Sequence, residues 1–197
     1  MKNLRYALWA VTLMLAGFLA WQTVDWYSKG GVDAAISIGG PFSAELASGE
    51  KITQKDVLGR PHVMFFGFTH CPDVCPTTLV EASSWLQELG SDADKLDFYF
   101  VSVDPERDTP EILSNYVSAF DDRIKGITGK PDEIAAMLKA YRIYAEKVPL
   151  EDDDYTMNHT ASNLLMNAKG EYFGTIAYQE NADTAVAKLK RLVATGS

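Results

Sequence analysis

The two cysteines of this chain, Cys71 and Cys75, are its only thiols and stand four residues apart. They follow a short apolar and aromatic run, residues 63–68, which is typical of a strand buried on both faces. Apolar residues with helical spacing follow Thr77 and stop at Gly90, so this segment is predicted to be a helix. The thiols are therefore expected between the end of a buried strand and the beginning of a helix.

That position limits the chemistry open to the pair. The unpaired N–H groups and the positive dipole end of a helix favour thiolate over thiol. Two convergent thiolates can close a disulfide, exchange a disulfide with a partner protein, or bind a soft metal ion. A structural disulfide, or two buried thiols without a reactive role, fits the spacing as well. All of these interpretations stay open at this point.

Of the three histidines, His159 is the most suggestive. It lies just ahead of a predicted strand, and loops at the ends of strands often carry functional groups. A surface histidine with satisfied hydrogen bonds is the alternative. His62, at the start of the buried strand, is interpreted as structural. His70, beside Cys71 in the chain, is a candidate for supporting a site without binding to it.

Acidic residues stand at and after the end of the second predicted buried strand, residues 96–104. They are Asp104, Glu106 and Asp108, and we expect them at the same end of the sheet as the cysteines. Helix capping and loop hydrogen bonding are their expected roles. The acidic run at residues 151–154 is interpreted as a solvated loop, with a docking surface for a partner as the alternative.

Strands and helices alternate over the rest of the chain. The pattern predicts a β-hairpin over residues 41–53, a turn or one-turn helix at 54–59, helices at 110–120, 131–141 and 184–193, a short segment at 124–129, a strand at 144–148, and a second hairpin over 161–177. The predicted fold class is therefore α/β, with a central mixed β-sheet flanked by helices and an N-terminal β-hairpin, in one domain at residues 41–197.

The N-terminal stretch carries no charge from Tyr6 to Val24, which is about the length that a helix needs to cross a bilayer. Lys2 and Arg5 precede it and favour a cytoplasmic N-terminus, so the globular part is expected to be exported. We predict a single transmembrane anchor at residues 1–27 and a flexible tether at 28–40. The alternatives are a cleavable signal peptide and, less favoured, a buried helix of a soluble protein.

The overall charge limits the partners. The 197-residue chain has a formal net charge of −9, which argues against nucleic acid and against an anionic membrane surface as partners. Two cysteines are too few for a disulfide scaffold, so any special role must come from their placement.

Three stretches together resemble the Sco/SenC family of copper-binding assembly factors for cytochrome c oxidase. They are residues 66–79 (FGFTHCPDVCPTTL), residues 101–110 (VSVDPERDTP) and residues 158–160 (NHT). The resemblance covers nearly all of the chain after the tether, and it implies a thioredoxin-like fold with copper bound by Cys71, Cys75 and His159. The family often has Asp-His where this chain has Asn158-His159, and an Asp-Pro turn where it has Asn167-Ala168. Both differences leave the ligand His159 in place, and they are expected to change the groups that surround it.

The resemblance implies a metallochaperone in the bacterial inner membrane, with its globular domain in the periplasm. It would bind Cu(I) or Cu(II) and help to assemble the CuA site of cytochrome c oxidase subunit II, with other periplasmic copper chaperones or thiol reductants as further partners. The chemistry agrees, because thiolates suit Cu(I), imidazole suits both oxidation states, and structural zinc would lack a fourth ligand.

Two enzymatic alternatives remain. The first is a thiol–disulfide reductase acting on the CuA-ligand cysteines, in which Cys71 and Cys75 are the catalytic redox pair. The second is a thiol peroxidase on the same scaffold. The metallochaperone hypothesis itself requires no enzymatic activity.

Overall fold

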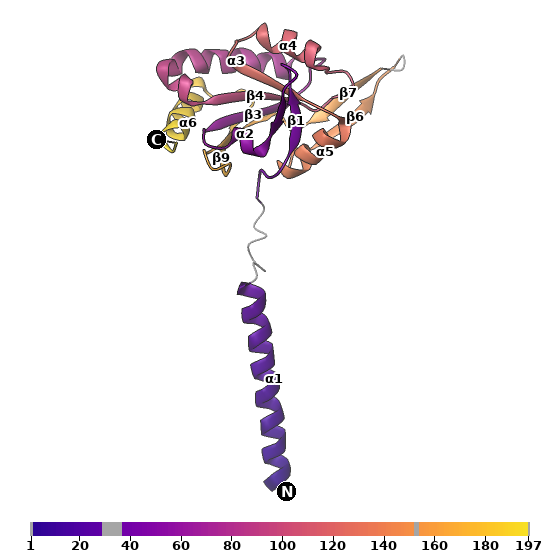
Figure 1. The fold of residues 1–197 in the computed structure, drawn as a ribbon, viewed down its shortest axis with the longest axis vertical. Coiled ribbons are helices and arrows are strands. Elements are labelled where there is room, and N and C mark those ends of the chain that lie inside the picture. The colour runs from indigo at the N-terminus through magenta and orange to yellow at the C-terminus, as the bar shows by residue number, and fades with distance from the viewer. Residues whose placement is uncertain (1, 29–36, 152–153, 197) are drawn as a thin grey trace. The chain divides into compact units, whose positions relative to one another are not determined.

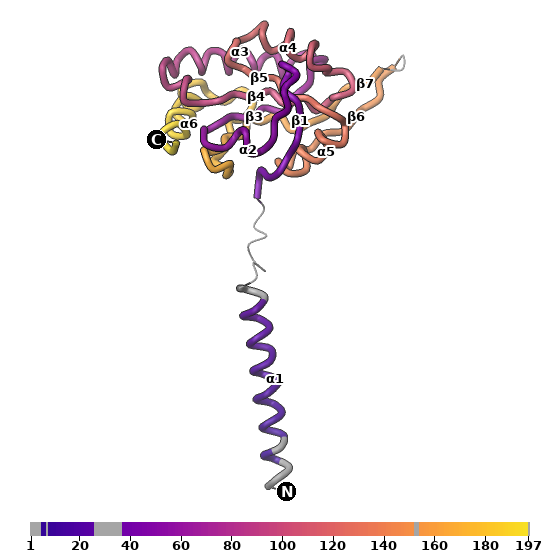
Figure 2. The backbone as a smooth tube through the Cα atoms, viewed as in Figure 1, coloured from indigo at the N-terminus to yellow at the C-terminus, as the bar shows by residue number. Residues whose placement is uncertain are grey.

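The computed structural model describes residues 2–28, 37–151 and 154–196, which form two compact units at residues 1–37 and 38–197 (Figures 1 and 2). The first unit is the helix α1 (Lys2–Ser28). Its segment Leu8–Asp25 is long and apolar enough to cross a membrane, a test that a signal sequence also passes. Anchor and signal peptide therefore both stay predictions, and the tether prediction lies largely outside the described residues.

The second unit is built on a seven-stranded mixed sheet with the strand order β2-β1-β5-β4-β3-β8-β9. The strands β3, β4 and β5 are parallel, and the remaining neighbours pair antiparallel. A separate two-stranded sheet holds β6 and β7. The bounds are β1 (Ser43–Leu46), β2 (Lys51–Thr53), β3 (His62–Gly67), β4 (Asp97–Ser102), β5 (Ile124–Thr128), β6 (Ala145–Pro149), β7 (Tyr155–His159), β8 (Ser162–Met166) and β9 (Tyr172–Ala177).

Helices cover both faces of the sheet, with α3 and α4 on one side and α2 and α5 on the other (Figure 1). They are α2 (Gln54–Val57), α3 (Val74–Leu89), the short 3-10 helix η1 (Gly90–Lys95), α4 (Pro110–Ser118), α5 (Pro131–Ala140) and α6 (Ala182–Ala194). The helix α6 packs against α3. The predicted α/β class, with a mixed sheet between helices and an N-terminal hairpin, is confirmed.

The centre of the sheet is the core of the unit. Every residue of β3 is buried, as its continuous apolar run predicts. On one face Phe65 packs against Phe100 with ring centroids 5.7 Å apart, and on the other Phe66 packs against Tyr141 at the same distance. The apolar stripe of α3 is buried, and Cys75 in its first turn lies beside Gly67 at the end of β3.

Two boundaries differ from the sequence prediction. The helix α3 begins at Val74, earlier than the predicted start at Thr77, and takes Cys75 into its first turn. Pro76 does not interrupt it, because N–H groups in the first turn of a helix have no partner within the helix. The segment with His159, expected to be a loop, is the strand β7, which pairs with β6.

Candidate metal centre

The strand β3 ends directly beneath the first turn of α3, and Cys75 packs at this junction. A Cβ atom on Gly67 would lie 2.8 Å from Cys75 Sγ and 2.7 Å from Phe100 Cε2, so only glycine lets the sulfur approach the strand this closely. Cys75 is buried and Cys71 is partly exposed. The backbone N–H of Cys75 donates to Cys71 Sγ at 3.4 Å, which brings the first sulfur over the start of the helix.

His159 is the last residue of β7, and its ring reaches the same junction. Its Nε2 lies 3.8 Å from Cys75 Sγ, and its Nδ1 lies 3.0 Å from the Thr160 carbonyl oxygen. Because that carbonyl can only accept, the neutral ring carries its proton on Nδ1 and turns an unprotonated Nε2 towards the sulfurs. Phe68 meets the imidazole edge-on, with ring centroids 5.7 Å apart. One ligand atom from each of Cys71, Cys75 and His159 lies within 4.8 Å of the others.

The two thiols differ in acidity. The pKa of Cys71 is lowered, chiefly because the Cys75 thiol donates a hydrogen bond to its sulfur, with the backbone N–H groups of Cys75 and Asp73 acting in the same direction. The pKa of Cys75 is raised, because it keeps the shared proton and burial disfavours a second negative charge. The pair therefore loses its first proton at the more exposed sulfur.

A cavity of about 240 Å³ opens from solvent onto Cys71 and His159. It is lined by Phe68, Cys71, Pro72, Asp73, Val74, Thr156, Met157, Asn158, His159 and Ala161. Two sulfurs and one imidazole nitrogen form a soft donor set that suits copper and, in the part of the chain that is described, offers one ligand fewer than structural zinc requires.

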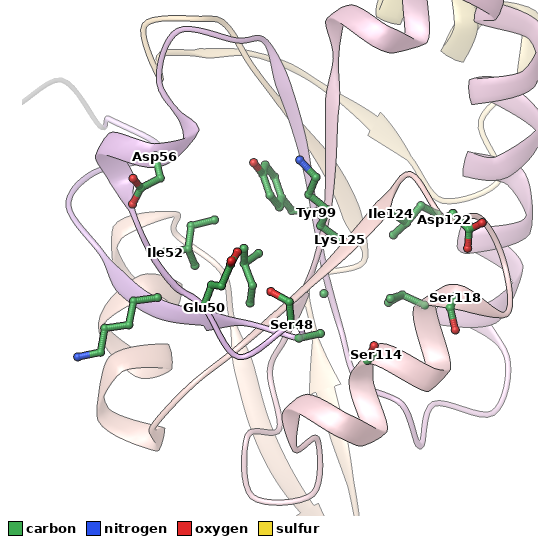
Figure 3. Close-up of a pocket in the computed structure, with 15 residues that line it drawn as sticks. Ser48, Glu50, Ile52, Asp56, Tyr99, Ser114, Ser118, Asp122, Ile124 and Lys125 are labelled. Carbon is green, nitrogen blue, oxygen red and sulfur yellow. The ribbon is translucent and has the colours of Figure 1, made fainter.

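A larger cavity, of about 610 Å³, lies elsewhere in this unit (Figure 3). It is bounded by the β1–β2 hairpin, β5 and α4, with Glu50, Asp56 and Lys125 among its lining residues. None of the three clustered ligand residues lines it, so the chemistry of the site belongs to the smaller cavity.

Comparison with known proteins identifies the family. The family model described as SCO1/SenC matches residues 31–194. The chain belongs to the SCO1/SenC family. The predicted family is thereby confirmed, and with it the thioredoxin-like fold of its solved members.

Among curated SCO1/SenC relatives, the human mitochondrial SCO1 homolog is 43% identical over 143 residues, covering 70% of this chain and 48% of the relative. SenC of Rhodobacter capsulatus is 36% identical over 144 residues, covering 72% and 64%. For the first three relatives compared, the match spans 40–54% of their own length, so this chain corresponds to about half of each.

Solved relatives share the fold. ScoI of Bradyrhizobium japonicum, solved with copper bound, has a TM-score of 0.75 and 48% sequence identity, covering 79% of this chain and 99% of that one. Yeast Sco1, also solved with copper bound, has a TM-score of 0.74 and 34% identity, covering 81% and 90%.

The other two histidines of this SCO1/SenC chain lie outside the cluster. His62 is buried at the far end of β3, with Nδ1 3.1 Å from the Arg60 carbonyl oxygen, which agrees with a structural role. His70 is exposed, and its Nδ1 lies 3.1 Å from Thr69 Oγ1. Neither joins the three clustered ligand residues.

The acidic residues after β4 make hydrogen bonds, as expected. Asp108 is buried and accepts from the N–H and hydroxyl of Thr69 and from the hydroxyl of Ser102. Asp104 is also buried, and it accepts from Arg107 and Tyr155. In the acidic run, residues 152–153 lie outside the described part of the chain.

Two residues near the site were not singled out from the sequence. Arg107 pairs with Asp154 at 3.3 Å and lies over the ring of Tyr155 at 3.7 Å. The available signal was the spacing of Tyr155 and His159, which in a strand places both side chains on one face.

Proposed function

We propose that this chain binds one copper ion through Cys71, Cys75 and His159 and delivers it to the CuA site of cytochrome c oxidase subunit II. The observation that carries the proposal is the convergence of His159 with a cysteine that lies 84 residues away in the sequence. The copper-bound structures of its relatives support copper as the metal. The oxidase as recipient is what the family resemblance implies.

Each of the three residues has a distinct part in this function. Cys71, partly exposed beside the cavity, is the first sulfur that an incoming ion meets. Cys75 supplies a second sulfur from the buried side, and His159 turns Nε2 towards both. With three ligands and an opening to solvent, the ion stays accessible to a recipient that offers further ligands.

The N-terminal helix supports a proposal for where the site acts. Lys2 and Arg5 precede the apolar segment Leu8–Asp25, so the positive-inside rule puts the N-terminus in the cytoplasm. We propose that α1 is an uncleaved anchor in the bacterial inner membrane and that the unit at residues 38–197 acts in the periplasm.

Copper binding by the full-length reduced chain, purified in detergent, tests the ligand set. The variants are His159→Ala, the double change Cys71→Ser with Cys75→Ser, and His70→Ala as the matched control, an exposed histidine outside the cluster. We expect about one copper per wild-type chain, none in the double variant, and an affinity at least about tenfold lower in His159→Ala. The control should bind like wild type.

Equal copper retention by the double cysteine variant would contradict the proposal. An unchanged affinity in His159→Ala would remove the histidine from the site. Transfer is tested by mixing the copper-loaded chain with the apo CuA domain of subunit II and following the appearance of the CuA absorption spectrum. Failure of wild type to transfer would overturn delivery while leaving binding intact.

A thiol–disulfide reductase is the second candidate, favoured by the different exposure of the two sulfurs. Cys71 is accessible for attack on a partner disulfide, and Cys75 lies behind it to resolve the mixed disulfide. That step leaves the partner as a dithiol and the pair oxidised, so an external dithiol must reduce it again. Reductase activity should survive His159→Ala, whereas copper affinity should fall. No observation favours the thiol peroxidase over these two.

A further inference from the structure

The hairpin of β6 and β7, which carries His159, stands apart from the central sheet (Figure 1). Its two strands pair with each other, and no described strand of the seven-stranded sheet pairs with them. Backbone hydrogen bonds of the main sheet therefore do not set the position of His159. The short link from His159 to β8 holds one end of β7, and side-chain contacts attach the rest of the hairpin to the unit.

The main polar contacts gather around Tyr155, at the opposite end of β7 from His159. The Tyr155 hydroxyl donates to Asp104 Oδ1 at 2.9 Å, and Arg107 Nε donates to the other oxygen of the same carboxylate at 2.5 Å. Arg107 Nη1 also donates to the Tyr155 carbonyl oxygen at 2.9 Å. We call Asp104, Arg107 and Tyr155 the tyrosine clamp.

Cations lie against the aromatic ring of the clamp. The Arg107 guanidinium carbon is 3.7 Å from the ring centroid of Tyr155, and Lys147 Nζ is 4.2 Å from it. Lys147, on β6, also pairs with Glu106 at 2.8 Å. The ring is therefore held by cation–π contacts as well as by its hydroxyl, and both strands of the hairpin are tied to the loop after β4.

The same loop is connected to the cysteines. The Ser102 hydroxyl accepts from the Asp104 N–H at 3.0 Å and donates to Asp108 at 2.6 Å. The Thr69 hydroxyl donates to the other oxygen of Asp108 at 2.6 Å, and Thr69 stands two residues before Cys71. A continuous chain of hydrogen bonds thus joins the clamp to Thr69, in the segment that leads to Cys71.

Strand geometry carries the effect of the clamp to the imidazole. Tyr155 and His159 are four residues apart in a strand, so their side chains share one face and are separated by about 13 Å along it. With Tyr155 fixed against Asp104, β7 cannot turn about its own axis without breaking these bonds. We infer that Tyr155, held by Asp104 and Arg107, is the positioning residue that sets His159 against the two cysteine sulfurs. The inference rests on the proposed function, because it takes His159 to be a copper ligand.

The decisive test measures copper affinity in two backgrounds. Tyr155→Ala and Tyr155→Phe are made in the full-length wild type and in His159→Ala, and affinity is measured by competition with a chelator of known strength. The matched control is Tyr144→Phe, because the exposed Tyr144 hydroxyl bonds to Glu146 within the hairpin and not to the rest of the unit.

We expect Tyr155→Ala to weaken copper binding about ten- to a hundredfold in the wild-type background, as outer partners of metal ligands do. Tyr155→Phe, which keeps the ring, should weaken it less, and Tyr144→Phe should leave it within about twofold. In the His159→Ala background Tyr155→Ala should not lower the copper affinity further, because Tyr155 acts on copper only by positioning His159. An equal loss in both backgrounds, or no loss in either, would overturn the inference.

Amide hydrogen exchange on the metal-free chain separates this inference from the proposed function. Exchange at residues 155–159 should become faster in Tyr155→Ala than in wild type, with β3 and β4 unchanged and with Tyr144→Phe matching wild type. Unchanged exchange in Tyr155→Ala would show that the clamp does not hold the hairpin, whatever copper does. Faster exchange together with a copper affinity that is insensitive to His159→Ala would instead count against the proposed ligand set.

Discussion

Replacing Gly67 by alanine tests how closely Cys75 is packed against the end of β3. The new Cβ would lie 2.7 Å from Phe100 Cε2 and 2.8 Å from Cys75 Sγ, closer than real Cβ contacts. Both side chains are fully buried, so neither can move aside into solvent. Overpacking of this kind costs about 1–3 kcal/mol, offset by about 0.4–1 kcal/mol from the smaller entropy of the unfolded chain. We expect a net loss of about 1–2 kcal/mol in the free energy of unfolding.

Gly174→Ala is the matched control, because Gly174 also lies in a strand, β9, and a Cβ there would meet no atom within 4 Å. It should leave the protein as stable as wild type or stabilise it by up to about 1 kcal/mol. The assay is urea unfolding of the reduced, metal-free chain. The slope of the unfolding free energy against urea concentration should be the same in wild type, Gly67→Ala and Gly174→Ala. A Gly67→Ala protein as stable as Gly174→Ala would refute the close packing of the sulfur.

Three further predictions concern the thiols and the network beside them. Under limiting iodoacetamide, Cys71 should be alkylated well before the buried Cys75, and at a lower pH than a free thiol because its pKa is lowered, as peptide mass spectrometry would show. Burial raises the pKa of Asp108 above its ordinary 3.8, so the stability that it contributes is greatest while the carboxyl is protonated and falls as pH rises through the folded-state pKa. The difference in unfolding free energy between wild type and Asp108→Asn should therefore decrease as pH rises from about 4 towards neutrality, and a difference that grows would contradict this. Ser102→Ala removes the bonds to Asp108 and to the Asp104 N–H and should cost about 1–3 kcal/mol in urea unfolding, whereas an unchanged midpoint would show that water replaces them.

Much of the fold follows from local patterns. The strand β3 was recognisable because a continuous apolar run of this length suits a strand buried on both faces. The beginning of α4 was recognisable because threonine favours the N-cap and proline favours the first helical position, and Thr109 and Pro110 stand in that order. In the structure Thr109 accepts a hydrogen bond from the Ile112 N–H. Such signals depend on neighbours in the chain, and they need no knowledge of the tertiary structure.

The first residue of α3 was harder to predict from the sequence, because the first turn of this helix contains a proline. Pro72 follows Cys71 and Pro76 follows Cys75, and each proline marks a possible helix start. The observed start at Val74 depends on how Cys75 packs against Gly67, which is a contact between segments. A pattern within one segment does not contain that contact.

The surroundings of His159 were the hardest part to predict. Its identity as a candidate was visible, but the pairing of β6 with β7 in a separate sheet was not. The contact of Arg107 with Tyr155 joins residues 48 positions apart, and no local periodicity indicates it. Charged and aromatic side chains at such separations are placed by the tertiary fold alone.

The cysteines and His159 differ in how they are attached to the core, and this difference affects how tightly a metal would be bound. Cys75 lies on α3 within the buried core, and Cys71 lies in the short loop between β3 and α3, whereas His159 lies on a hairpin that side-chain contacts attach to the unit. If the imidazole occupies its observed place for only a fraction of the time, the apparent affinity of the three-ligand site falls in proportion to that fraction. The dithiol contribution does not change with it. A change in how firmly the hairpin is attached would therefore change the copper affinity without any change at the sulfurs. Tyr155 makes the contacts that attach the hairpin, so substitutions there would act on copper affinity in this way.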